Sequence, residues 1–192
     1  MASWYSTVLA FSLLSFISLM TTGCSSDSGL PVLGSVPRFQ LTDQNGRAFD
    51  SGQTLQSTIW VADFFFTNCP GPCPLMSSKL KQVQTYLTGT GIKILSFTVD
   101  PAHDTPRVLF EYGRHFDARS GTWYFLTGPR QTLQVLSKDA FKLGDVDDTM
   151  DHSTRFVLVD RKGRIRAYYL STEQHVVDQL VADAKALLKE RS

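Results

Sequence analysis

One apolar segment constrains the fold of this chain more than any other feature. Residues 59–67, IWVADFFFT, are almost uninterrupted by polar side chains and have the length of a strand. A strand that is apolar on both faces needs cover on both faces, as a central strand has in a sheet with helices on either side. The segment therefore predicts a buried central strand in an α/β core.

The segments around this strand alternate between strand and helix patterns. Upstream, FQLTDQNGRAF alternates apolar and polar residues around Asn45-Gly46, which predicts a hairpin with a two-residue turn. Downstream, apolar residues at helical spacing predict a helix that buries Leu75, Leu80, Val83 and Leu87. Further strands are expected in 92–100, 123–128, 154–160 and 164–170, and further helices across 108–116, 129–141 and 172–190. This order predicts an α/β, thioredoxin-like sheet with helices on both faces, plus an N-terminal β-hairpin.

Length and charge narrow the class of protein. The chain has 192 residues, 42% of them hydrophobic, which fits one globular domain with a proper core. Its 19 Lys and Arg are scattered against 18 Asp and Glu, so no basic stripe is present to neutralise a phosphate backbone. Nucleic acid is therefore not an expected partner. Three cysteines are too few for a disulfide-stapled scaffold.

The N-terminal segment resembles a secretory signal. Residues 8–20 carry no charge, and small residues follow them immediately before Cys24. The pattern is similar to a bacterial lipobox, so we expect a lipoprotein-type signal peptide over 1–23, acylation of Cys24, a linker over 24–36 and one domain over 37–192. The alternative is an uncleaved signal anchor over 4–22. Both place the domain in the bacterial cell envelope, anchored to the membrane and outside the cytoplasm.

Two cysteines stand where the central strand passes into the next helix. Cys69 and Cys73 are four residues apart, so in a loop that has begun to coil both sulfurs can converge on one small object. A helix N-terminus favours thiolate over thiol, and thiolate is the form that binds a metal or attacks a disulfide. A plain structural disulfide is the alternative for a cysteine pair in an exported protein.

A metal site needs a further ligand, and His152 is the candidate. It stands just ahead of a buried strand, in a loop expected beside the cysteine loop. Two thiolates and one imidazole can hold Cu(I) and also support Cu(II). Without the cysteine pair, a capping or surface role would be the expected one for His152. A second histidine, His103, is expected at the solvated surface. Asp100 is read as a turn residue first and as a hydrogen-bond partner of the histidine second.

Three motifs together resemble the Sco (SenC-type) family. TNCPGPCP is similar to its TxCPxxCP motif, VDPAHDTP to its DPxxDTP loop, and DHSTRFVLVDRKG to its histidine segment, in the same order and over roughly residues 36–189. The resemblance implies a thioredoxin-like fold with copper bound by Cys69, Cys73 and His152. It also implies a role in assembling the dinuclear copper site of cytochrome c oxidase subunit II, with another copper chaperone or a thiol reductant as a further partner.

Two functions follow from these residues. The first is a copper metallochaperone that binds one copper ion without catalytic turnover. The second is a membrane-anchored thiol-disulfide oxidoreductase, which would cycle a redox disulfide between Cys69 and Cys73 to reduce the oxidase or another envelope target. Oxidoreductases of this fold typically have two residues between the cysteines and a proline facing them. Here three residues intervene and GDVDDTMDHST contains no proline, which favours the chaperone; a peroxiredoxin-like peroxidase ranks third.

Overall fold

A computed structural model describes Met1, residues 28–143 and residues 153–190. Its sheet has eight strands in the order β1-β8-β7-β4-β5-β6-β2-β3. The strands are β1 (Gly34–Ser35), β2 (Gln40–Asp43), β3 (Ala48–Asp50), β4 (Trp60–Phe65), β5 (Lys93–Thr98), β6 (Trp123–Thr127), β7 (Arg155–Val159) and β8 (Arg164–Leu170). The helices are α1 (Ser51–Thr54), α2 (Cys73–Tyr86), α3 (Pro106–His115), α4 (Arg130–Gln134), a π-helical turn η1 (Val135–Ala140) and α5 (Val176–Lys189).

The apolar segment is the centre of this sheet. β4 lies between β5, which runs parallel to it, and β7, which runs antiparallel, and all six of its residues are buried. Neighbouring residues of a strand point to opposite faces. Accordingly, Phe64 contacts Phe141 beside η1, whereas Phe65 contacts Tyr112 of α3. The prediction of a strand covered on both faces is confirmed.

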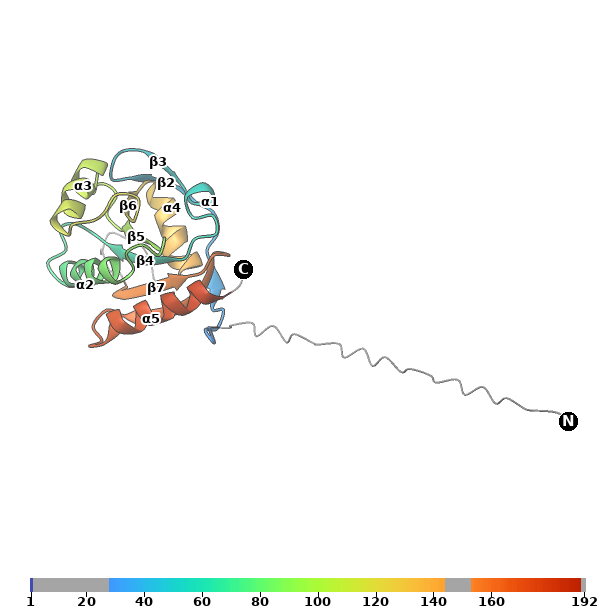
Figure 1. The fold of residues 1–192 in the computed structure, drawn as a ribbon. Coiled ribbons are helices and arrows are strands. Elements are labelled where there is room, and N and C mark those ends of the chain that lie inside the picture. The colour runs from blue at the N-terminus through green and yellow to red at the C-terminus, as the bar shows by residue number, and fades with distance from the viewer. Residues whose placement is uncertain (2–27, 144–152, 191–192) are drawn as a thin grey trace.

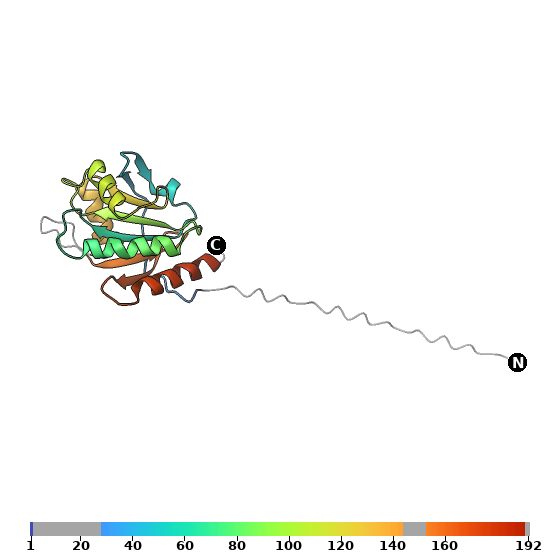
Figure 2. The same ribbon diagram turned by 60° about the vertical axis from the view of Figure 1, so that its left-hand side comes forward.

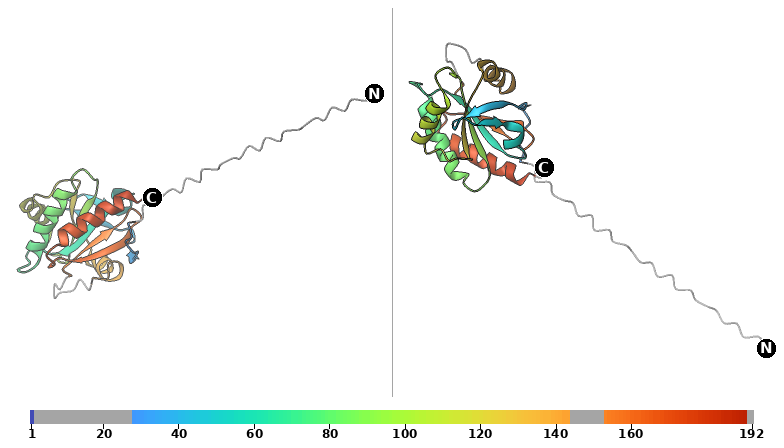
Figure 3. Two further views of the ribbon diagram at one scale, coloured as in Figure 1. Left: turned by 60° about the horizontal axis from the view of Figure 1, so that its bottom comes forward. Right: turned by 90° about the horizontal axis from the view of Figure 1, so that it is seen from above.

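The helices form two layers around the sheet. α2 and α5 pack side by side on one face (Figures 1 and 2). α4 and η1 lie on the other face, as the view from above shows (Figure 3). The arrangement matches the expected thioredoxin-like order, because each parallel crossover between β4, β5 and β6 carries one helix.

The hairpin forms as expected, but its turn is longer than two residues. β2 and β3 pair antiparallel, and the Asp43 N–H donates to Arg47 O at 2.9 Å. The Asp43 carboxylate accepts from the N–H groups of Asn45 and Arg47, which holds the loop. Gly46 takes φ +74° and Asn45 does not have a positive φ. A type I′ turn needs positive φ at both central residues, so this is a three-residue loop closed by one glycine.

Two helix predictions need correction. α2 begins at Cys73 itself, and Leu75 is 54% exposed while Met76 is fully buried in its place. The Leu75 assignment was wrong because Leu75 and Leu80 are five residues apart, which places them on different faces of the helix, whereas Met76 stands four residues before Leu80. The helix expected over 129–141 is a short α-helix that widens into a π-helical turn, ending beside the buried Phe141 ring.

The N-terminal part of the described domain is bound to the sheet edge. Residues 28–36, which were expected to be linker, include β1, which pairs with the start of β8. The predicted signal segment, Cys24 and the alternative signal anchor lie outside the described residues. Within the described part of the chain, no helix has the length and apolarity needed to cross a membrane.

Candidate metal centre

The cysteine loop is set by the end of β4 and the start of α2. β4 ends at Phe65, and the Cys69 N–H then donates to Phe66 O at 3.3 Å, which turns the chain back. Pro72 is the N-cap of α2 and its carbonyl accepts from the Met76 N–H at 2.9 Å. Prolines suit this position because the first helical turn has no use for their missing N–H. Cys69 therefore lies in the loop and Cys73 in the first turn of the helix.

The two cysteine side chains lie next to each other. Cys69 is 9% exposed, Cys73 is fully buried, and both are present as thiols. A hydrogen bond joins the two side chains. The pair thus sits at the edge of the core, with Cys69 on the solvent side and Cys73 beneath it.

Burial controls the protonation of the inner cysteine. It raises the pKa of the Cys73 thiol far above the ordinary value; the hydrogen bond with Cys69 raises it further, and the bond with the Phe66 backbone lowers it. The expectation that the helix N-terminus would favour a thiolate is wrong for Cys73, because desolvation of the charged form outweighs that effect. Without a bound cation, Cys73 is a thiol at neutral pH, so metal binding must release its proton.

Asp63 is a buried carboxyl group on the α2 side of the sheet. It lies in the middle of β4, where burial raises its pKa to about 7. Ser96 Oγ donates to Asp63 Oδ1 at 2.6 Å, and the Trp123 indole N–H donates to Ser96 Oγ at 2.9 Å. Asp63 Oδ2 has no hydrogen-bond partner among the described residues. Its charge also raises the pKa of Cys73, so Asp63 belongs to the electrostatic surroundings of the cysteine pair.

A second buried carboxylate, Asp104, holds the cysteine loop in place. Its oxygens accept from the Thr67 N–H at 3.2 Å and from the hydroxyl groups of Thr67 and Thr98. Thr67 lies two residues before Cys69, and Thr98 is the last residue of β5. One side chain thus ties the loop to the neighbouring strand. Burial raises the pKa of Asp104, and these hydrogen bonds oppose the shift.

The role of Asp104 was not predicted from the sequence. The cap of α3 is Thr105, whose hydroxyl accepts from the Val108 N–H. An aspartate in the same motif as Asp100 was the available signal, but its partner Thr67 is 37 residues away. Asp100 has the expected turn role, because its carbonyl accepts from the N–H groups of His103 and Asp104.

One histidine lies nearer to the loop than expected. His103 Nε2 is 3.0 Å from Asn68 Nδ2, and Asn68 directly precedes Cys69. His103 is exposed, as expected for a surface residue, and no group of three or more His, Cys, Asp or Glu side chains among the described residues is placed to hold a metal ion. The predicted third ligand, His152, lies outside the described residues. In the sequence it stands three residues before β7, which pairs with β4.

The chemistry of the pair fits a soft metal ion. Two adjacent sulfurs, one of them fully buried, offer ligands that Cu(I) prefers over hard oxygen donors. The surroundings are apolar, since Phe66 and Met76 belong to the same buried cluster. The same two sulfurs could also be oxidised to a disulfide. The geometry of the described residues admits both chemistries.

Comparison with known proteins shows which sequences this chain is similar to. The sequence model of the SCO1/SenC family matches residues 33–189, which is most of the chain. The SCO1 protein homolog of Bacillus subtilis is 30% identical over 163 residues, covering 81% of this chain and 84% of that protein. The match therefore extends over the whole described domain.

Solved structures agree with the sequence match. A SCO1/SenC family lipoprotein of Bacillus anthracis has a TM-score of 0.74 at 30% identity, covering 80% of this chain and 95% of that one. BsSco, described as a member of the Sco family of cytochrome c oxidase assembly proteins with a disulfide switch, has a TM-score of 0.74 at 27% identity, covering 84% and 98%. Yeast Sco1 with copper bound has a TM-score of 0.62 at 30% identity, covering 82% and 95%. Fold, cysteine loop and sequence match agree: the chain belongs to the SCO1/SenC family.

Proposed function

We propose that this protein is a copper metallochaperone that binds one copper ion through Cys69, Cys73 and His152. The observation that carries the proposal is the pair of adjacent, buried thiols at the junction of β4 and α2. Copper bound to yeast Sco1, a protein of the same family, supports the choice of metal. We propose His152 as the third ligand because it precedes β7 by three residues, and the start of β7 pairs beside the end of β4, after which the cysteines follow.

The protonation of Cys73 suits a protein that both takes up and gives away its metal. Copper binding displaces a proton from a thiol that otherwise stays protonated at neutral pH, so part of the intrinsic binding free energy offsets this deprotonation. On transfer, the departing copper leaves a neutral thiol in an apolar site, not a buried charge. Copper is the cargo in this account, and no turnover is required.

The proposed recipient is the dinuclear copper site of cytochrome c oxidase subunit II. The description of BsSco as belonging to a family of cytochrome c oxidase assembly proteins supports this choice. Another copper chaperone or a thiol reductant would supply copper or reducing equivalents. We place the protein in the bacterial cell envelope, held at the membrane through acylated Cys24, and the Bacillus anthracis lipoprotein of the same family supports that anchor.

The second candidate is a thiol-disulfide oxidoreductase using Cys69 and Cys73. The observation that favours it is the contact between the two side chains, which brings the sulfurs close enough to exchange electrons as a pair. The disulfide switch described for BsSco is consistent with such chemistry. Against it stands the spacing of the pair, because oxidoreductases of this fold typically have two residues between their cysteines and here three intervene.

Copper stoichiometry separates these functions. We would purify the chain with Cys24→Ser throughout, so that the only thiols are Cys69 and Cys73, and compare it with Cys69→Ala, Cys73→Ala and His152→Ala. The proposal predicts one copper per chain with sulfur-to-Cu(II) charge-transfer bands that each substitution abolishes or strongly alters, and negligible insulin reduction. Weak copper binding that is indifferent to His152→Ala, with rapid thiol-disulfide turnover needing both cysteines, would establish the oxidoreductase instead.

A further inference from the structure

Hydrogen bonds attach residues 28–36, the first described segment of the domain, to β8 and to the residue after α5. We call these contacts the clamp. Residues 28–36 run along β8, where the Leu33 N–H donates to Ile165 O and the Val36 N–H donates to Gly163 O, both at 2.8 Å. The Ser28 backbone N–H and hydroxyl both donate to the Glu190 carboxylate, just after α5. The chain therefore enters the domain at a defined point, between the start of β8 and the end of α5.

Arg166 is the centre of this clamp. Its side chain is almost fully buried and donates to both oxygens of Glu190 at 2.9 Å and to Asp160 at 3.0 Å. The same guanidinium donates to the carbonyls of Leu30 at 2.6 Å and Pro31 at 3.1 Å. A bidentate arginine-carboxylate pair that also binds backbone carbonyls resists fraying. The entry segment is thus part of the rigid domain.

The chain between this clamp and the membrane is short. If Cys24 is acylated, four residue steps separate it from Ser28, which allows at most about 14 Å even when fully extended. With the alternative signal anchor ending at residue 22, six steps allow at most about 20 Å. Either anchor holds the clamped end of the domain within one or two helix diameters of the bilayer.

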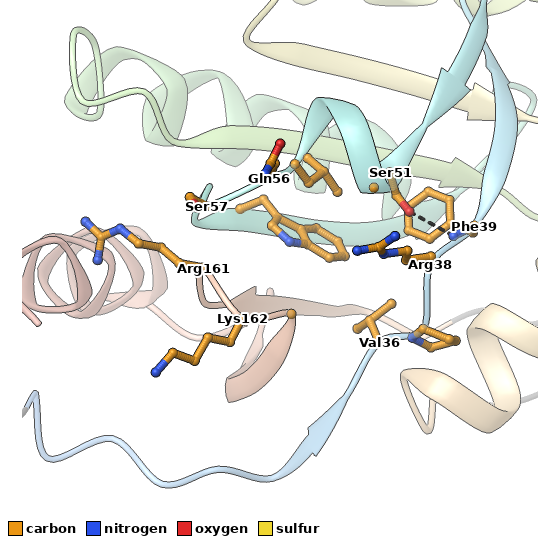
Figure 4. Close-up of a pocket in the computed structure, with 13 residues that line it drawn as sticks. Val36, Arg38, Phe39, Ser51, Gln56, Ser57, Arg161 and Lys162 are labelled. Carbon is orange, nitrogen blue, oxygen red and sulfur yellow. Dashed lines mark hydrogen bonds between the residues drawn. The ribbon is translucent and has the colours of Figure 1, made fainter. Parts of the chain in front are cut away.

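Cations gather at the same end of the domain. Arg38, Arg161 and Lys162 line one surface pocket, and no aspartate or glutamate lines it. The charged ends of Arg161 and Lys162 extend outward, away from Phe39 and Ser51 (Figure 4). Arg161 also donates to the carbonyls of Leu187 and Leu188 beside the clamp, so this pocket and the entry point of the chain are neighbours.

The carboxylates at this end do not cancel those charges. Asp160 is paired with Arg164 and Arg166, and Glu190 is paired with Arg166. The Asp50 carboxylate caps α1 by accepting from the Gly52 and Gln53 N–H groups. Each exposed cation near an anionic lipid surface contributes about 1 kcal/mol to attraction. The turn at 161–163 is therefore suited to contact anionic headgroups.

We propose that this end of the domain, formed by residues 28–36, the turn 161–163 and the last turn of α5, rests against the anionic phospholipid surface of the membrane. We call it the anchor face. The cysteine loop lies at the opposite end of β4, whose six residues span roughly 20 Å. The copper site is thus presented away from the bilayer, at a height set by the domain itself. The inference rests on the proposed membrane anchorage.

Lipid photocrosslinking tests this orientation on the full chain in membranes of the cells that express it. A photoreactive amino acid replaces either Lys162, on the anchor face, or Leu75, which is exposed in the first turn of α2 beside the cysteine loop. The orientation predicts at least about fivefold more crosslinking to phospholipid from position 162 than from position 75, because a short tether raises the local concentration of one face only.

A lengthened tether provides the matched control without disturbing the fold. Inserting 20 Gly/Ser residues between residues 27 and 28 adds a flexible reach of about 25 Å and leaves the clamp intact. Crosslinking from position 162 should then fall severalfold, while position 75 stays low. Equal crosslinking at both positions with the native tether would overturn the orientation alone. A chain found entirely in the soluble fraction would overturn the anchorage as well.

Discussion

Replacing Asp63 by asparagine should change how stability depends on pH. The wild-type carboxyl group is fully buried, accepts one hydrogen bond from Ser96, and has one oxygen without a partner among the described residues. Burial therefore favours its protonated form and raises its pKa from 3.8 to about 7. Asparagine keeps the acceptor for Ser96 and has no charge to bury at any pH.

The magnitude follows from the pKa shift. Between pH 3.8 and about 7 the folded protein retains the proton on Asp63 and the unfolded chain does not, so folding loses about 1.4 kcal/mol per pH unit. From pH 5 to 7 the loss is about 3 kcal/mol, and above pH 7 it levels off because both states are ionised. Asp63→Asn should lack this slope, so it gains about 3 kcal/mol on the wild type between pH 5 and 8.

Urea unfolding of the metal-free, reduced protein at pH 5 and pH 8 measures this difference. Asp104, whose pKa is also raised, titrates in both proteins and cancels. Asp139→Asn is the matched control, because Asp139 is exposed and the substitution should leave the pH dependence of stability unchanged. A stability difference between wild type and Asp63→Asn that is the same at both pH values would show that burial does not raise the pKa of Asp63 into this range.

Two other substitutions test the packing around the site. Asp104→Asn replaces one of two accepting oxygens by a donor that faces the Thr67 and Thr98 donors. We therefore expect a loss of about 1–3 kcal/mol in unfolding free energy, and a weaker copper affinity in a competition titration. Unchanged copper affinity would contradict the role of Asp104 in holding the cysteine loop. Gly113→Ala would place a Cβ 3.0 Å from the Phe125 ring, and this overpacking should cost about 1–3 kcal/mol of unfolding free energy, more than the gain of about 1 kcal/mol from replacing a helical glycine. In the control, Gly71→Ala, the new Cβ meets no atom within 4 Å, so the same urea assay should show almost no change in stability.

The central strand could be predicted because one local pattern determines it. An apolar run of strand length has few alternatives to a position between two helical layers, and Phe64 and Phe65 pack against opposite layers as expected. The cysteine pair was also readable, since strand, loop and helix follow one another directly in the chain. Patterns confined to a few neighbouring residues carry this information.

The buried carboxyl groups that surround the cysteine pair could not be predicted from such local patterns. Asp104 acts through Thr67 and Asp63 through Ser96, and both partners lie more than thirty residues away along the chain. Their proximity depends on the parallel pairing of β4 with β5, which no local pattern encodes. The exposure of Leu75 was missed for a simpler reason: its spacing of five from Leu80 does not fit one helical face, and Met76, four residues before Leu80, is the residue that is buried.

The protonation of Cys73 is the point where tertiary structure changes the chemistry. A helix N-terminus next to a cysteine predicts a thiolate, but full burial among apolar side chains reverses the balance. A protonated Cys73 must lose its proton when copper binds, so the metallochaperone proposal couples copper uptake to proton release.

X-ray absorption at the copper edge identifies the atoms that bind the copper ion. The Cu(I)-loaded chain carrying Cys24→Ser, and the same chain with His152→Ala, would be compared at one copper per chain. The account predicts two sulfur scatterers and one nitrogen scatterer, with the nitrogen lost in His152→Ala and both sulfurs retained. A spectrum without nitrogen, or a nitrogen scatterer that survives His152→Ala, would contradict the proposed ligand set.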